Sequence, residues 1–212
     1  MKEKIKKLLP NMITLSRVVS LIIGFILFLK GYWKISIVLY IYGSVSDAFD
    51  GYFARKWDAY TKFGSYLDAI SDKFYALSII ILSLINKNYF IILIALLELI
   101  ITIINYKAVK KNIKVETVRI GKFKMTFEFL TLITALLSIN INEIYYGFIP
   151  LLIITMYFGV QSVNAYVNKL HNKKYKVLIT DKDFKGKRSL DKAKLLLKEF
   201  KYYLLHPVRI IK

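Results

Sequence analysis

Four aspartates stand close together in strongly apolar surroundings: Asp47, Asp50, Asp68 and Asp72. Within each pair the spacing is three or four residues, which places both side chains on one face of a helix. Acidic side chains are costly in an apolar helix and usually mark a functional site. Carboxylates bind Mg²⁺, Mn²⁺ or Ca²⁺ well and soft metals poorly. The spacing therefore predicts two helices that present four carboxylates to divalent metal ions.

A transport pathway is the competing interpretation, because acidic residues in membrane helices also serve ion pathways and proton relays. The neighbouring residues favour a metal and a phosphate. Gly51, Ala54 and Gly64 are small enough for a ligand or a helix to approach the backbone closely. Arg55 can neutralise a carboxylate or bind a phosphate. No zinc site is expected, since the chain has no cysteine and both histidines, His171 and His206, lie within residues 169–212.

The elements that position these carboxylates are long apolar runs separated by basic segments. The chain has 212 residues, of which 56% are hydrophobic, and a formal net charge of +19. This pattern is typical of a polytopic membrane protein. Each run is near the ~20 residues that a helix needs to cross a bilayer. We therefore expect an all-α integral membrane protein with six transmembrane helices, at about residues 13–29, 35–57, 63–85, 89–106, 125–141 and 144–168.

Three parts are expected along the chain. Residues 1–10 are predicted to form an amphipathic juxtamembrane helix whose lysines face lipid headgroups. Pro10 and Asn11 are expected to break the chain before the first span. Residues 11–168 then form the six-helix domain, and residues 169–212 form a basic cytoplasmic tail with a short helix.

The tail contains 14 Lys or Arg residues against 4 Asp or Glu residues. Its predicted helix has one apolar stripe, made of Leu190, Ala193, Leu197, Phe200 and Leu204. Two interpretations are open: the helix packs on the loops of the domain, or it docks on anionic lipid.

Lysine and arginine are distributed unevenly between the two sides of the predicted membrane domain. The N-terminal segment, residues 55–62, residues 107–124 and the tail hold nearly all of them, and the opposite loops hold only Lys30, Lys34 and Lys87. By the positive-inside rule, both termini and the aspartates lie on the cytoplasmic side of the cell membrane. Basic residues that flank apolar spans fit an anionic membrane surface, so no nucleic-acid partner is expected.

Residues 47–72 resemble, without a gap, the signature of the CDP-alcohol phosphotransferase (phosphatidyltransferase) family, D-x2-D-G-x2-A-R-x8-G-x3-D-x3-D. The fixed positions are Asp47, Asp50, Gly51, Ala54, Arg55, Gly64, Asp68 and Asp72. Upstream, PNMITLSR resembles the family's P-N-x-x-T-x-x-R entry to its first helix. The resemblance covers about residues 8–168, and it implies the family's six-helix plan and its common homodimer.

The resemblance also implies a reaction, in which an alcohol hydroxyl attacks the β-phosphorus of a CDP-linked lipid or alcohol and CMP leaves. Two Mg²⁺ or Mn²⁺ ions would be bound by the four aspartates, and Asp72 would also accept the hydroxyl proton. The implied contacts to the CDP-lipid are Asn11, Thr14, Gly51, Arg55 and Thr61.

The segment RIGKFKMTFEF resembles the G-K-x-K-T segment of phosphatidylglycerolphosphate synthases, with Met125 in place of the threonine. LLELIITIINYK, around Glu98, resembles their fourth helix but has Leu97 and Asn105 where that helix usually has arginines. The candidates for acceptor binding are Lys107, Arg119, Lys122 and Lys124. A basic loop whose lysines only hold it on the cytoplasmic side is an equally open interpretation of this region.

The resemblance thus implies transfer of a phosphatidyl group from CDP-diacylglycerol to an alcohol. Because phosphatidylglycerolphosphate synthases are the members that the chain resembles most, glycerol 3-phosphate is the acceptor that we expect. The acceptors that stay open are phosphatidylglycerol, serine, an inositol phosphate and a specialised alcohol. A membrane transporter or scaffold without enzymatic activity is the remaining alternative.

Overall fold

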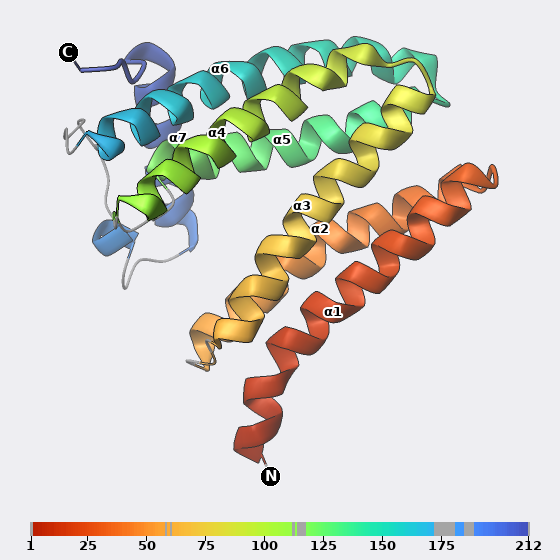
Figure 1. Cartoon of the computed structure of the whole chain (residues 1–212), viewed down its shortest axis with the longest axis horizontal. Helices are drawn as coiled ribbons and strands as arrows, with labels where there is room; N and C mark the ends of the chain where they lie inside the picture. The colour runs from red at the N-terminus through yellow and green to blue at the C-terminus, as the bar shows by residue number, and fades with distance from the viewer. Residues whose placement is uncertain are drawn as a thin grey trace. The chain divides into compact units, whose positions relative to one another are not determined.

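The structure is a computed structural model that describes residues 2–57, 59, 61–111, 113, 118–171, 181–184 and 189–211. The side chains of residues 2–7, 48, 55, 62, 65, 181 and 182 also lie outside the description. All regular elements in these ranges are helical (Figure 1). They are α1 (Lys2–Leu29), α2 (Trp33–Lys56), α3 (Lys62–Ile85), η1 (Tyr89–Ile91), α4 (Ile92–Lys110), α5 (Arg119–Ser138), η2 (Asn142–Ile144), α6 (Tyr145–Leu170), η3 (Asp181–Phe184) and α7 (Ser189–Leu205), where η marks a 3₁₀ turn.

The chain divides into two compact units. The first consists of Met1–Ile92 and Phe129–Ile149, and the second of Leu93–Glu128 and Pro150–Lys212. Helices α1, α2 and α3 belong to the first unit, and α7 belongs to the second. The aspartate pairs on α2 and α3 therefore lie in one unit.

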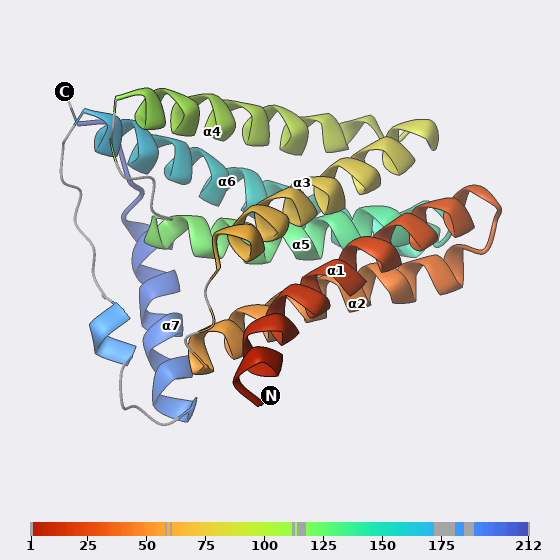
Figure 2. The same cartoon turned by 60° about the horizontal axis from the view of Figure 1, so that its bottom comes forward.

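In the first unit, α1 and α2 form a hairpin and lie side by side along their length (Figures 1 and 2). The turn between them contains Gly31, whose φ of +87° is favourable only for a residue without a Cβ. Gly24 and Gly43 lie in the contact, where an added Cβ would meet the side chains of Tyr40 and Leu21. These small residues allow the close approach that places the polar end of α2 against α1.

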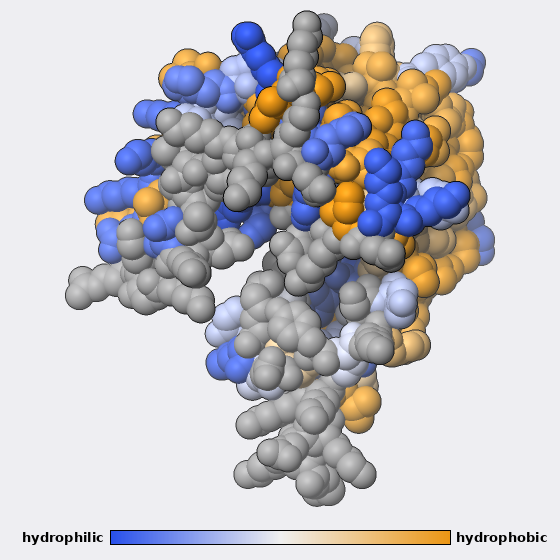
Figure 3. Space-filling view, turned by 60° about the vertical axis from the view of Figure 1, so that its left-hand side comes forward, coloured by the Kyte–Doolittle hydropathy of each residue, from blue (hydrophilic) through white to orange (hydrophobic). Residues whose placement is uncertain are grey.

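Three stretches of the described residues are long and apolar enough to cross a membrane: Leu8–Leu29, Tyr89–Lys110 and Asn142–Leu170. Many large apolar side chains are exposed. A broad apolar area is visible on the surface, beside areas of hydrophilic side chains (Figure 3). These features fit a chain that spans a membrane more than once. The further spans predicted over α2, α3 and α5 stay predictions, because these helices contain charged residues within or beside their apolar runs.

Two boundaries differ from those expected. Helix α1 continues through Pro10, so the predicted break between an interfacial helix and the first span is wrong. A proline removes one helical hydrogen bond and can bend a helix without ending it. Helix α5 begins at Arg119, so the basic segment that was expected to be a loop up to Lys124 is partly helical.

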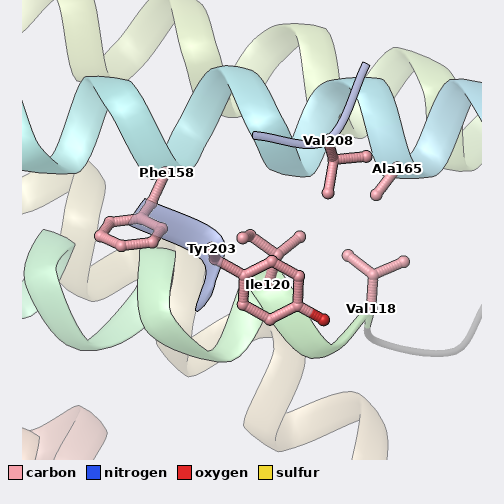
Figure 4. Packing of buried hydrophobic residues seen from close by; sticks show 6 residues of the cluster. All are labelled: Val118, Ile120, Phe158, Ala165, Tyr203 and Val208. Atoms are coloured by element: carbon pink, nitrogen blue, oxygen red, sulfur yellow. The ribbon is translucent and has the colours of Figure 1, made fainter. Parts of the chain in front are cut away.

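In the second unit, α7 packs on the N-terminal part of α5 and on α6. A buried apolar cluster joins them (Figure 4). It consists of Val118, Ile120, Phe158, Ala165, Tyr203 and Val208. Tyr203 of α7 lies between side chains from the other two helices, which fixes the rotation of α7 about its own axis.

A row of amide side chains on α6 binds the backbone that follows α7. We call Gln161, Asn164 and Asn168 the amide row; their spacing of three and four residues places them on one face of α6. Asn164 Nδ2 donates to Val208 O at 2.9 Å, and Val208 N donates to Gln161 Oε1 at 3.1 Å. Asn168 Nδ2 donates to Arg209 O at 2.8 Å, and Ile211 N donates to Asn168 Oδ1 at 2.9 Å. The extended segment after α7 is thereby held along α6.

Candidate metal and nucleotide site

Three of the four predicted metal ligands come together. Asp47 and Asp50 of α2 and Asp68 of α3 each offer a carboxylate oxygen, and these oxygens lie within 4.8 Å of one another. Asp50 is buried, and the other two are half-buried. This donor set can bind a hard divalent cation. Same-face spacing on two helices thus led to the correct grouping.

The fourth aspartate joins the group through an arginine of α1. Arg17 is 1% exposed, and its guanidinium contacts three of the carboxylates. Nη1 donates to Asp47 Oδ1 and, at 3.3 Å, to Asp72 Oδ1, while Nη2 donates to Asp68 Oδ1 at 2.7 Å. Helices α1, α2 and α3 therefore all contribute to one charged cluster.

Sequence reasoning gave Arg17 no role, although it ends the PNMITLSR segment. A signal was available: an arginine inside an apolar helix is as costly as an aspartate and carries the opposite charge. Its partner was not predictable from spacing, because the contact depends on how α1 packs against α2 and α3.

The charge balance of the cluster favours additional cations. When all four aspartates are ionised they carry four negative charges, of which Arg17 balances one, so three negative charges are left. Divalent ions bound to the same oxygens would reduce this excess. The guanidinium already contacts oxygens of Asp47, Asp68 and Asp72, so a metal ion held by the aspartate group would share Asp47 and Asp68 with it.

Asp50 is oriented by a different partner. The buried Thr14 hydroxyl lies 2.7 Å from Asp50 Oδ2, to which it donates, and 3.0 Å from the carbonyl oxygen of Pro10. This contact fixes one oxygen of the carboxylate without adding charge. Thr14 was expected to contact the CDP-lipid, and the structure places it directly beside a metal-ligand candidate.

A cavity of about 130 Å³ opens beside the carboxylates. Its lining includes four of the five residues expected to contact the CDP-lipid, namely Asn11, Thr14, Gly51 and Thr61. Asp50 and Asp68 also line it. The side chain of Arg55, the fifth, lies outside the described residues. Sites for small molecules usually measure ~300 Å³ or more, so this cavity has room for only part of a nucleotide.

The first turn of α3 is built closely against α1. Thr61 caps the helix, since its hydroxyl accepts a hydrogen bond from Gly64 N at 2.9 Å. Asn11 Nδ2 donates to the same hydroxyl oxygen at 3.4 Å. An added Cβ on Gly64 would clash with the side chains of both Asn11 and Thr61. The glycine of the signature is therefore required here by packing.

The four candidates for acceptor binding lie in the second unit. Lys107 of α4 and Lys122 of α5 are exposed. Lys124 is buried; it forms an ion pair with Glu98, and its Nζ lies 2.6 Å from Glu128 Oε2. It therefore contributes to the internal charge balance of its unit, and its acceptor role stays a prediction.

Arg119 is bound by the tail. Its Nε donates to Glu199 Oε1 of α7 at 2.9 Å, and its Nη2 donates to Glu199 Oε2. Its guanidinium carbon lies 4.9 Å from the ring centre of Phe184. Glu199 is fully buried, so this pair anchors α7. An acceptor role for Arg119 likewise stays a prediction.

The names of curated relatives fit the resemblance. A curated relative from Rickettsia felis, named CDP-diacylglycerol--glycerol-3-phosphate 3-phosphatidyltransferase, is 35% identical over 88 residues, which are 40% of this chain and 49% of the relative. A protein of the same name from Sodalis glossinidius is 30% identical over 138 residues, which are 60% of this chain and 76% of the relative. The chain spans about half the length of the first curated relatives it matches. No solved structure matches.

The family model for CDP-alcohol phosphatidyltransferase matches residues 7–162. This range contains the carboxylate cluster, Arg17 and the cavity. With the three apolar spans, it identifies a multi-pass membrane protein. The carboxylates on α2 and α3, the glycine that the packing of α3 against α1 requires, and the match over most of the chain all agree: the chain belongs to the CDP-alcohol phosphatidyltransferase family.

Proposed function

We propose that this protein transfers the phosphatidyl group of CDP-diacylglycerol to glycerol 3-phosphate and releases CMP, a step of phospholipid biosynthesis. The observation that carries the proposal is the carboxylate cluster of α2 and α3, open to a cavity lined by the residues expected to contact the CDP-lipid. The names of the relatives supply the donor and the acceptor.

The reaction exchanges one P–O bond for another. The acceptor hydroxyl oxygen bonds to the β-phosphorus of the donor, and the bond from that phosphorus to the bridging oxygen breaks, so CMP leaves with this oxygen. Asp72 is proposed to accept the hydroxyl proton; its side chain is 29% exposed, so it is accessible to a substrate. Arg17 holds Asp72 and Asp68 in fixed positions.

Asp47, Asp50, Asp68 and Asp72 are proposed to bind two divalent ions, Mg²⁺ or Mn²⁺. Bound there, the ions would neutralise the pyrophosphate and stabilise the leaving CMP. Asn11, Thr14, Gly51 and Thr61 are proposed to position the CDP part of the donor within or beside the cavity. Arg55 is proposed for the same role from the signature alone.

We further propose six spans over residues 11–168, with both termini and the site on the cytoplasmic side of the cell membrane. The three apolar helices and the distribution of lysine and arginine support this topology. Residues 169–212 are then a cytoplasmic tail. A homodimer is proposed from the resemblance to the family.

Release of CMP tests the proposal. Purified protein in detergent, given CDP-diacylglycerol and glycerol 3-phosphate, should release CMP with Mg²⁺ or Mn²⁺ and stop when EDTA removes the metal. Asp72→Asn should abolish turnover while the melting temperature stays near that of the parent protein. The matched control is Asp191→Asn, on the exposed surface of α7, which should keep full activity. Turnover in Asp72→Asn would exclude Asp72 as the base. If the parent protein released no CMP with any acceptor, the proposed enzymatic function would be excluded.

A second acceptor is favoured by one observation. Leu97, at a position where phosphatidylglycerolphosphate synthases usually have an arginine, is 4% exposed and packs against Gly159 of α6. This position therefore offers no charge to an acceptor phosphate. Among the open acceptors, this favours those without a phosphate monoester, namely phosphatidylglycerol, serine or a specialised alcohol, over an inositol phosphate. Side-by-side reactions with mass detection of the lipid product separate these possibilities.

A further inference from the structure

Helix α7 has an apolar face that its own unit leaves uncovered. Leu190, Leu197 and Leu204 are 69%, 55% and 47% exposed, and Ala193 is also exposed. Their spacing of three, four and seven residues places them on one side of the helix. We call these four residues the leucine stripe.

Three exposed lysines border the stripe. At 100° per residue, Lys194, Lys198 and Lys201 lie along one edge of it. Asp191, the exposed acidic residue of α7, lies farther round the helix. The uncovered face is therefore apolar with a cationic edge.

The orientation of this face is fixed from the opposite side of α7. Glu199 and Tyr203 are fully buried there, with Glu199 paired to Arg119 and Tyr203 inside the apolar cluster (Figure 4). The Tyr157 hydroxyl donates to Leu204 O at 2.7 Å. Rotation that would bury the stripe fully against α5 or α6 would break these contacts, so the stripe stays exposed.

An open cavity of about 740 Å³ adjoins the stripe. It lies between α5 and α7 and has a largely apolar lining that includes Phe123, Phe127 and Leu197. Lys122 and Lys192 also line it. Leu197 belongs to both the cavity and the stripe, so the apolar surface is continuous and again has cationic side chains beside it.

The direction of α7 suits a membrane surface. Within the second unit, α7 runs across α5 and α6 in both views (Figures 1 and 2). Helix α6 is one of the stretches long and apolar enough to cross a membrane. A helix that runs across a membrane-spanning helix extends along the plane of the bilayer, which is the direction that an amphipathic helix takes at a lipid surface.

We propose that the leucine stripe of α7 docks on an anionic lipid surface, with Lys194, Lys198 and Lys201 at the headgroup phosphates. The lysines along the edge favour an anionic lipid surface over a purely apolar partner, because only the anionic surface attracts their positive charge. This docking goes beyond the proposed transfer reaction. It concerns a helix outside the residues that match the family.

Single cysteines test the proposal in the full chain, because the natural sequence has none. Leu197→Cys on the stripe and Asp191→Cys off it would each carry an environment-sensitive fluorophore, in vesicles of phosphatidylcholine with or without phosphatidylglycerol. Quenching by lipid-borne nitroxide and by iodide in water would be compared. Leu190→Cys provides a second stripe position if labelling at 197 disturbs the fold.

Lipid quenching at 197 should exceed that at 191 and should rise with phosphatidylglycerol. The triple variant K194Q/K198Q/K201Q should lose this rise, since each lysine near an anionic surface contributes roughly five-fold to partitioning. Equal iodide quenching at 191 and 197 in both vesicles would overturn the proposal. Lipid quenching at 197 that is independent of phosphatidylglycerol would overturn the role of the lysines. Protection from both quenchers together with cross-linking between copies would show that a second protein chain covers the stripe, and would also overturn it.

Discussion

Arg17→Gln is expected to destabilise the metal-free protein by about 3 kcal/mol, the lower end of the cost of removing one partner of a buried ion pair. The substitution removes the guanidinium that contacts Asp47, Asp68 and Asp72. The arginine side chain is 2% exposed, but those of its partners are 28%, 48% and 29% exposed, so water screens the carboxylates left behind. For a chain of this size the loss corresponds to a fall of roughly 6–12 °C in melting temperature.

Metal should restore part of this loss. A divalent ion at the proposed site would bind carboxylates that Arg17 contacts, so the rise in melting temperature on adding Mn²⁺ should be larger in Arg17→Gln than in the parent protein. Thermal unfolding in detergent, followed by the fluorescence of the two tryptophans with EDTA or with Mn²⁺, measures both effects. Arg17→Lys keeps the charge but loses the contacts made by both guanidinium nitrogens, so its melting temperature should lie between those of Arg17→Gln and the parent protein.

Two results would refute this reasoning. An unchanged melting temperature of Arg17→Gln in EDTA would show that the guanidinium does not stabilise the carboxylates. A smaller response to Mn²⁺ in the variant than in the parent protein would show that Arg17 assembles the metal ligands instead of competing for them.

Three further substitutions test other contacts. Gly64→Ala forces a Cβ into neighbouring side chains and should cost about 1–3 kcal/mol of stability. The control is Gly147→Ala, where nothing lies within 4 Å of the added Cβ, and its stability should stay within about 0.5 kcal/mol of that of the parent protein. Equal melting temperatures of the two variants would contradict the packing argument. Thr14→Val removes the hydrogen bond to Asp50, so CMP release should need a higher Mn²⁺ concentration for half-maximal rate, and an unchanged concentration would contradict it. Glu199→Gln weakens the buried ion pair that anchors α7 and should speed tryptic cleavage within α7 without changing the cleavage of α1; unchanged cleavage of α7 would show that the pair is not an anchor.

Local periodicity was enough to predict the helices and the grouping of three of the four aspartates. Asp47 and Asp50 share a face of α2 because helices repeat every 3.6 residues, and their convergence with Asp68 followed from placing two such faces together. The same reasoning could not find the position of Arg17, because its contacts join residues 30 to 55 positions apart. Spacing describes one helix, and the packing of three helices decides which side chains meet.

Charge was a weaker guide to boundaries. The basic segment before Lys124 was predicted to be a loop because lysines near a span mark its cytoplasmic side, but positive charge does not prevent a helix, and α5 begins at Arg119. Pro10 was likewise given too much weight as a helix breaker. The ion pair of Arg119 with Glu199 was also unpredictable, because 80 residues separate the partners.

The amide row of α6 has a consequence for the order in which the chain is made. Gln161, Asn164 and Asn168 bond to backbone groups 41 to 47 positions later, so α6 leaves the ribosome well before these bonds can form. During that interval three amide side chains of an otherwise apolar helix lack the partners they have in the completed chain. The second unit therefore closes only after the segment beyond α7 has been made, and an insertion of α6 into the bilayer as it emerges would precede the step that satisfies its polar face.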